Sequence, residues 1–112
     1  MRHLFENRCK TLTMEEAQKQ LEMSKEIFVL DVRTRNEYES GHIPDSIHLP
    51  LHLLPVSLEQ YVKDKQAKVF VYCRSGNRSQ QACAFMMRQG YTDVTNIGGI
   101  ISWQGSVIKG VS

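Results

Sequence analysis

Two apolar segments, residues 27–32 (IFVLDV) and 69–72 (VFVY), constrain the fold of this chain more than any other feature. Neither segment alternates polar with apolar residues, as a strand with one wet face does, so both are expected to be strands covered on two faces. Shorter strands are expected at 47–49 and 94–97, and segments of helical pattern lie between the strands. Because strands that alternate with helices build parallel sheets, the sequence predicts an α/β fold with helices on both faces of the sheet.

The helical segments are marked by capping residues and by apolar spacing. Thr13 and Glu16 have the spacing of a capping box, which predicts a helix from there to Met23. Gly90 is expected to cap the longest helix, and Gly98 and Gly99 to form a turn. Further helical segments are expected at 36–41, 57–63, 79–90 and 100–104. Two of them have predicted inner faces: Leu58, Tyr61 and Val62 in the second, and Ala82, Cys83, Phe85, Met86 and Gln89 in the third.

The length of 112 residues, without repeats or linkers, predicts a single domain over residues 1–112 with a core at about 11–105. No apolar run approaches the roughly 20 residues needed to span a bilayer. The first ten residues lack the apolar core of a signal peptide. We therefore expect no membrane association and a cytoplasmic protein, and a monomer because no exposed apolar stripe is evident.

The charged residues are unevenly distributed along the chain. The net charge is only +2, yet residues 68–112 carry five basic side chains and one acidic side chain. This bias suits a small anion as partner. It does not indicate nucleic-acid binding, because the chain has neither a long basic run nor aromatic residues interleaved with basic ones.

The three cysteines and four histidines do not form a metal-binding pattern. An odd number of cysteines without a C-x-x-C pair argues against both a disulfide framework and a zinc site. His48 and His52 are four residues apart, but Pro50 interrupts any helix that would align them. We expect reduced thiols, no metal and no cofactor.

Cys73 differs from the other cysteines, because it follows a buried strand and precedes residues 74–79 (RSGNRS). In a parallel sheet, binding sites form at the carboxyl ends of the strands. The N–H groups of residues 74–79 are expected to surround the sulfur, with Gly76 permitting the tight backbone. The start of the next helix adds about half a positive charge, and Arg74 and Arg78 add two full charges. Together they favour the thiolate, so the pKa of Cys73 is expected below the ordinary value of about 8.5, beside a site for an anion.

The other two cysteines have ordinary explanations. Cys83 lies in the middle of a predicted helix among apolar neighbours and is expected to be a small buried residue. Cys9 lies in a polar stretch without a partner and is expected to be incidental. Only Cys73 is therefore a candidate nucleophile.

Three motifs resemble the rhodanese family of sulfurtransferases in its single-domain form. The first motif comprises 31–33 (DVR), Glu37-Tyr38 and 41–50 (GHIPDSIHLP). The second is the loop at 69–79 (VFVYCRSGNRS), and the third is 96–103 (NIGGIISW). The resemblance covers nearly everything from about Thr11 to about Gly105, and it implies a five-stranded parallel sheet flanked by helices.

The resemblance also implies a reaction. In this family the cysteine attacks the outer sulfur of a donor such as thiosulfate, releases sulfite and becomes a persulfide. An acceptor then removes that sulfur: cyanide in assays, a thiol or a partner protein in cells. By resemblance, Cys73 carries the persulfide, the binding loop holds it as an anion, and two arginines orient the donor. The loop residues are Arg74, Ser75, Gly76, Asn77, Arg78 and Ser79.

Other motif residues are expected to act indirectly. Asp31 and Arg33 are expected to form a hydrogen-bonded pair that braces the neighbouring loops. Gly41, His42 and Pro44 are expected to make a turn, with His42 hydrogen-bonded there and not acting as a base. Trp103 is expected to pack in the core beneath the site.

Two other classes of protein remain as alternatives. Cysteine phosphatases and arsenate reductases resemble rhodaneses in fold, but their loop reads His-Cys-x5-Arg. Here Tyr72 precedes the cysteine and Arg78 follows five positions later. The second alternative is a non-catalytic rhodanese-like binding module, and such modules usually lack the cysteine. The donor also stays open, because a polysulfide, glutathione persulfide or protein persulfide are alternatives to thiosulfate.

Overall fold

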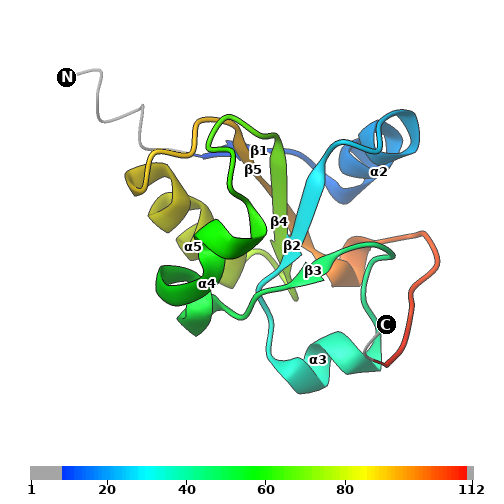
Figure 1. Cartoon of the computed structure of the whole chain (residues 1–112). Coiled ribbons are helices and arrows are strands. Elements are labelled where there is room, and N and C mark those ends of the chain that lie inside the picture. The colour runs from blue at the N-terminus through cyan, green and yellow to red at the C-terminus, as the bar shows by residue number, and fades with distance from the viewer. Residues whose placement is uncertain (1–8, 111–112) are drawn as a thin grey trace.

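The computed structural model describes residues 9–110, which form a five-stranded sheet with helices on both faces (Figure 1). The strands are β1 (Lys10–Thr11), β2 (Phe28–Asp31), β3 (Ile47–His48), β4 (Val69–Cys73) and β5 (Val94–Gly99). They lie in the order β1-β5-β4-β2-β3, and each neighbouring pair is parallel. The predicted α/β fold with a five-stranded parallel sheet is thereby confirmed.

The helices divide between the two faces of the sheet. They are α2 (Met14–Met23), α3 (Arg35–Ser40), α4 (Leu54–Tyr61) and α5 (Asn77–Arg88), with 3-10 turns η1 (Leu51–Leu53) and η2 (Ile100–Ser102). Helices α4 and α5 cover one face of the sheet, and α2 covers the other. Helix α3 lies beyond the carboxyl end of β2 (Figure 1). The capping box of Thr13 and Glu16 begins α2 as predicted, with both reciprocal hydrogen bonds present.

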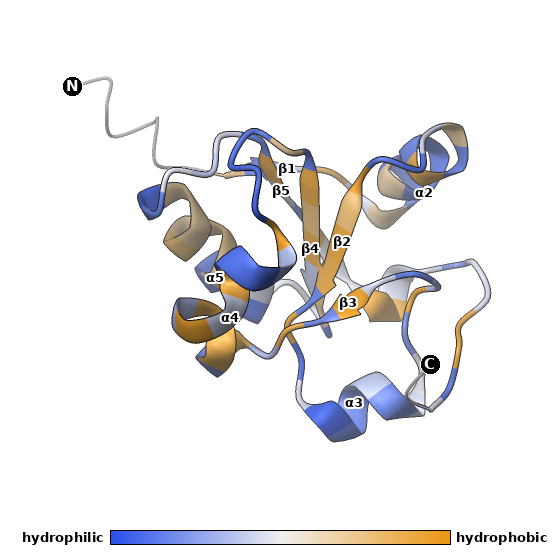
Figure 2. Cartoon of the chain, in the orientation of Figure 1, coloured by the Kyte–Doolittle hydropathy of each residue, from blue (hydrophilic) through white to orange (hydrophobic). Residues whose placement is uncertain are grey.

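Two apolar clusters fill the spaces between the sheet and its helices, and the central strands are apolar along their length (Figure 2). Because side chains alternate along a strand, β4 contributes to both clusters. Val69, Val71 and Cys73 face the α5 side, whereas Phe70 and Tyr72 face the α2 side. This alternation directs the cysteine toward the helix that follows it.

Several predicted boundaries were wrong. The apolar patterns indicate four strands and give no sign of β1, a two-residue edge strand with both residues exposed. Helix α4 begins at Leu54, three residues before the predicted start, because Pro55 occupies its first turn and fits there. The predicted inner faces of the helices included two residues too many, since Tyr61 and Gln89 are exposed.

Gly98 and Gly99 belong to β5 and do not form a turn. The pairing of β5 with β4 shifts by one residue at this point, so that Tyr72 lies opposite Gly98 and Cys73 opposite Gly99. Such a bulge bends the strand without ending it. Gly99 therefore lies directly beside the cysteine.

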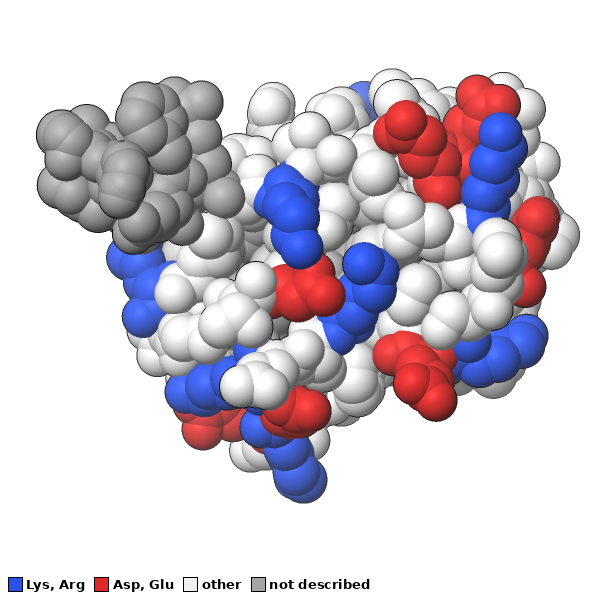
Figure 3. Space-filling model, turned by 90° about the horizontal axis from the view of Figure 1, so that it is seen from above, with Lys and Arg blue, Asp and Glu red and all other residues white. Residues whose placement is uncertain are grey.

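The surface carries charges of both signs. On the side of the molecule seen from above, basic and acidic side chains are interspersed and no large area of one sign is visible (Figure 3). Within residues 9–110, no helix has the length and apolar character needed to cross a bilayer. The predicted domain of 1–112 includes residues 1–8 and 111–112, which lie outside the described part of the chain.

Candidate active site

Cys73 is the last residue of β4 and is only 1% exposed. Its Sγ accepts a hydrogen bond from the N–H of Gly76 at 3.0 Å and lies 3.5 Å from Oγ of Ser79. Gly76 has a φ of 112°, a conformation that other residues rarely adopt. The loop therefore folds back over the sulfur, as the sequence predicts.

The loop makes Cys73 more acidic than an ordinary cysteine. Burial alone raises the pKa of a thiol, because it removes the charged form from water. Here burial is outweighed by hydrogen bonds from the Ser79 side chain and from the N–H groups of Ser79, Gly76 and Ser75, so the pKa of Cys73 is lowered. The direction of the pKa shift agrees with the prediction, and hydrogen bonds are its main favourable source.

Cys83 shows the opposite behaviour in the same cluster. It is fully buried in α5, and burial raises its pKa far above the ordinary value, with a further contribution from nearby Cys9. Cys83 is thus the buried apolar residue that the sequence predicts. Cys9 is not isolated, however, because it is buried against the same cluster and its Sγ lies 3.6 Å from Oε1 of Gln80.

The end of β5 forms the support beneath the loop. A Cβ atom added to Gly99 would overlap the carbonyl oxygen of Arg74 and the Cα of Ser75. A Cβ on Gly76 would in turn contact Gly98. The loop can therefore lie this close to the sheet only because residue 99 has no side chain.

The two arginines of the loop differ in their surroundings. Arg78 makes a bidentate ion pair with Glu37 of α3, with N–O distances of 2.7 and 2.9 Å. Hydrogen bonds from Arg78 are the main reason why the pKa of Glu37 is lowered to about 2. Arg78 keeps the predicted positive charge, but the ionised carboxylate of Glu37 balances it, so the net positive charge beside the sulfur is smaller than the sequence suggests. Arg74 has an exposed side chain.

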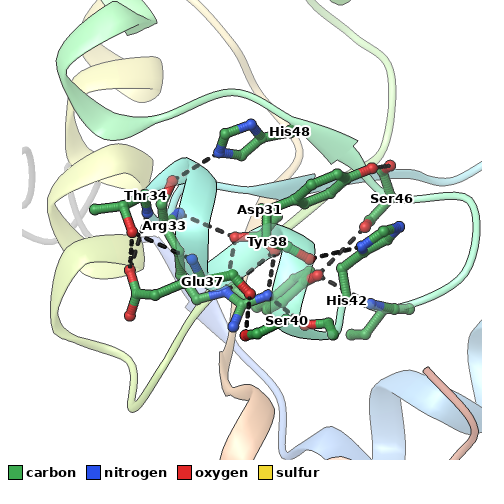
Figure 4. Close-up of polar contacts among 12 residues, drawn as sticks. Asp31, Arg33, Thr34, Glu37, Tyr38, Ser40, His42, Ser46 and His48 are labelled. Carbon is green, nitrogen blue, oxygen red and sulfur yellow. Dashed lines mark hydrogen bonds and ion pairs between the residues drawn. The ribbon is translucent and has the colours of Figure 1, made fainter. Parts of the chain in front are cut away.

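Asp31 and Arg33 form the predicted pair at the end of β2 (Figure 4). Nε and Nη2 of Arg33 lie 2.6–3.1 Å from the carboxylate oxygens, and both residues are buried. Nη2 also donates to the carbonyl oxygen of Gly41 at 2.8 Å, and Nε2 of His48 lies 2.8 Å from the carbonyl oxygen of Arg33. The pair joins the segments that follow β2 and α3, as expected of a brace.

Tyr72 and His42 anchor the turn before β3. The Tyr72 hydroxyl accepts the N–H of Ile43 at 3.1 Å and lies 3.2 Å from Oγ of Ser46. His42 is buried, with Nδ1 2.8 Å from the carbonyl oxygen of Tyr38 and its ring stacked on the Tyr38 ring at 3.7 Å (Figure 4). His42 is hydrogen-bonded in the loop, which is the role the sequence predicts.

Trp103 does not lie beneath the site. It packs against the cluster on the α2 side, whereas Cys73 belongs to the cluster on the α5 side. Its Nε1 donates to the carbonyl oxygen of Ser106 at 2.9 Å. The expectation of core packing holds in part, because Trp103 is half-buried, but the predicted location was wrong.

A family model of the rhodanese-like domain matches residues 13–106. The chain belongs to the rhodanese-like domain family. A protein named sulfurtransferase from Allochromatium vinosum is 47% identical over 81 residues, which are 71% of this chain and 74% of that relative. A protein named thiosulfate sulfurtransferase GlpE from Pseudomonas syringae is 39% identical over 77 residues, covering 68% and 71% of the two chains.

A solved structure supports the same assignment. The structure described as rhodanese with anions from E. coli has a TM-score of 0.71 and 33% identity, and the match covers 75% of this chain and 99% of that one. At this identity and coverage the rhodanese fold extends over the segment that contains the loop.

Two residues around the loop, Glu37 and Asn96, had no predicted role in the site. Glu37 is the acidic member of a capping box with Thr34 at the start of α3, so the sequence offered a helix-start signal and no sign of its ion pair with Arg78. Asn96 is a polar residue inside a buried strand, and its side chain contacts the loop. A buried polar residue among apolar neighbours requires hydrogen-bond partners. A single asparagine within an apolar strand was therefore the feature of the sequence that could have indicated a contact with the loop.

No group of three or more His, Cys, Asp or Glu side chains that could hold a metal ion occurs among residues 9–110. The hydrogen bonds around Cys73 and its lowered pKa support the chemistry of a single activated sulfur. Cys73 can act as a nucleophile, and the surrounding N–H groups can stabilise a negative charge on it or on a sulfur attached to it.

Proposed function

We propose that this protein is a sulfurtransferase that carries a sulfane sulfur as a persulfide on Cys73. The observation that carries the proposal is the acidic thiol of Cys73 enclosed by N–H donors at the carboxyl end of β4. An ionised sulfur is the reactive form of cysteine. Relatives named sulfurtransferases support the same reaction class.

The first half-reaction transfers a sulfur atom to the enzyme. The Cys73 thiolate attacks the outer sulfur of thiosulfate, forming a new S–S bond while the old S–S bond breaks. Sulfite leaves with the bonding electron pair, and the enzyme retains a persulfide anion. The N–H groups of the loop stabilise this anion as they do the thiolate, by charge-assisted hydrogen bonds. Because Cys73 is 1% exposed, the loop has to open slightly for the donor to reach the sulfur.

The second half-reaction returns the enzyme to its starting state. A nucleophilic acceptor, either cyanide or a thiolate, attacks the terminal sulfur, and Cys73 leaves as the thiolate. The two steps balance without a cofactor, an external oxidant or a net change in protons. Thiosulfate is the donor we propose, with Arg74 and Arg78 attracting it, and a small persulfide can enter the same cycle.

The loop does not favour the phosphatase alternative. Cys73 is followed by Arg78 after four residues, and the next position is Ser79, whose side chain is directed to the buried sulfur and to Asn96. Tyr72, which stands in the position of the phosphatase histidine, turns to the opposite face and anchors residues 43–46.

The test is to replace the sulfur and measure transfer. Cys73→Ser should abolish thiocyanate formation from thiosulfate and cyanide, while Cys83→Ala, a control that removes a thiol outside the loop, should retain it. Circular dichroism establishes that both variants fold. A Cys73→Ser variant that keeps its rate, or a wild-type protein that hydrolyses an aryl phosphate through Cys73 and transfers no sulfur, would refute the proposal.

A further inference from the structure

Asn96 is a polar residue in the middle of β5, and it is only 8% exposed. Its Cα lies opposite Val71, two residues before the cysteine on the neighbouring strand. Its side chain extends to the start of α5, where it contacts Gly76, Ser79 and Gln80. Asn96 therefore reaches Cys73 through other residues of the loop.

The orientation of the Asn96 amide is fixed by partners that have only one possible role. The N–H of Gly98 can only donate, and it lies 2.9 Å from Oδ1. The carbonyl oxygen of Gly76 can only accept, and it lies 3.2 Å from Nδ2. Reversing the amide would lose both hydrogen bonds, so Oδ1 must face Ser79.

Ser79 has one hydroxyl proton and three acceptors within reach. Its Oγ lies 2.7 Å from Oδ1 of Asn96, 3.1 Å from the carbonyl oxygen of Gly76 and 3.5 Å from Sγ of Cys73. The shortest contact identifies Asn96 as the acceptor while the sulfur is a neutral thiol, which is a weak acceptor. In that state the hydroxyl oxygen is free to accept from the S–H of Cys73.

Ionisation of the sulfur changes this preference. A thiolate is a charged acceptor, and hydrogen bonds to charged groups are about twice as strong as those between neutral groups. Rotation of one O–H bond then moves the Ser79 proton from Asn96 to Cys73. Oδ1 of Asn96 keeps the hydrogen bond from Gly98, so no buried acceptor is left without a donor.

We propose that Asn96 is a positioning residue for Cys73, which holds the Ser79 proton while the sulfur is a thiol and releases it when the sulfur becomes a thiolate. The inference rests on the proposed function, since it concerns the same sulfur. Asn96 thus limits ionisation of the Cys73 thiol. It also holds the Ser79 hydroxyl in the position from which that hydroxyl can bind the thiolate.

Other charges near the sulfur do not account for this coupling, because they remain in every variant used to test it. Arg78 and the Cys73 thiolate attract one another, and Arg78 is paired with Glu37. The charged groups near the carboxyl ends of β2 and β4 are Asp31, Arg33, Glu37, Arg74 and Arg78.

The experiment measures the pH dependence of Cys73 alkylation by iodoacetamide, a neutral reagent whose rate follows the thiolate fraction. The proteins compared are wild type, Asn96→Leu, Ser79→Ala and the double variant. Asn96→Leu should lower the midpoint by roughly 0.5–1 pH unit, the equivalent of one neutral hydrogen bond. Ser79→Ala should raise the midpoint, and adding Asn96→Leu to it should cause no further change.

Each other outcome contradicts the inference. A midpoint that is unchanged or raised in Asn96→Leu excludes competition for the proton. If Asn96→Leu shifts the alkylation midpoint equally in the wild-type and Ser79→Ala backgrounds, Asn96 acts through Gly76 or through general packing. Thr95→Val, whose side chain points to the opposite face of the sheet, is the matched control and should leave the midpoint unchanged.

The measurement remains decisive when individual variants fail. If Asn96→Leu does not fold, Asn96→Ala removes the same acceptor without adding an apolar branch, and the same shift is expected. Alkylation requires no sulfur donor, so the coupling can be established even if the protein transfers no sulfur. In that case only the proposed function fails.

Discussion

The ion pair between Arg78 and Glu37 determines how much positive charge the site presents to an anionic donor. The bidentate geometry and the pKa of Glu37, lowered to about 2 by Arg78, keep this carboxylate ionised at neutral pH. Glu37→Gln removes the charge but keeps the shape. Glutamine also serves in a capping box, so the start of α3, where Glu37 accepts the N–H of Thr34, should survive.

The size of the effect follows from the exposure of the pair. The two side chains are 32% and 28% exposed, so water screens their attraction and the pair contributes about 1 kcal/mol. Once Glu37 is neutral, a similar attraction becomes available to a dianionic donor. Since 1.4 kcal/mol is about tenfold in affinity, the KM for thiosulfate should fall about fivefold, with kcat nearly unchanged.

The same substitution affects stability in a pH-dependent way. The pKa of Glu37 is lower in the folded protein than the value of 4.5 expected without these contacts. Its stabilisation is therefore complete above about pH 4.5 and is lost as the pH falls through about 2. Urea unfolding should show Glu37→Gln to be less stable than wild type by about 1 kcal/mol at neutral pH. This difference in stability should disappear as the pH falls to about 2.

The assay is steady-state thiocyanate formation at several thiosulfate concentrations and at constant ionic strength. Glu39→Gln is the matched control, because Glu39 pairs with Arg35, whose side chain is 75% exposed, and it should leave KM unchanged. A KM that stays constant or rises in Glu37→Gln would refute the reasoning, since it would show that Arg78 does not meet the donor.

Three further predictions concern the loop, the brace and the sulfur. Gly99→Ala should displace the loop and reduce sulfur transfer by about 100-fold in the thiocyanate assay, and a wild-type rate would show that the close contact is unimportant. Asp31→Ala should leave the buried Arg33 charge without its partner and lower the free energy of unfolding in urea by about 3–5 kcal/mol; a loss below about 1 kcal/mol would contradict the brace. Because the pKa of Cys73 is lowered, the rate of persulfide formation should fall with decreasing pH at a midpoint below the ordinary value of about 9, and a midpoint at or above that value in stopped-flow kinetics would count against it.

Much of the fold could be predicted from short-range patterns. The apolar runs identified the central strands β2 and β4, and the capping box identified the start of α2. The position of Cys73 at the end of a buried strand, followed by glycine and small residues, was enough to predict the loop around the sulfur. These features depend on neighbours in sequence, which a single chain displays.

The remaining features depend on contacts between distant segments. Glu37 and Arg78 are 41 positions apart, and only the folded sheet brings α3 against the start of α5. Asn96 enters the site because β5 lies beside β4. Gly98 and Gly99 resemble a turn in sequence, and the role of Gly99 beneath the loop becomes visible only when the backbone of Arg74 is placed against it.

The central claim is that Cys73 accepts and holds a sulfur atom, and intact-protein mass spectrometry after incubation with thiosulfate tests it most directly. The account predicts a gain of one sulfur atom in the wild-type protein, its removal by cyanide, and no gain in Cys73→Ser. Wild-type protein that remains unmodified, or a gain of sulfur that persists in Cys73→Ser, would contradict the account.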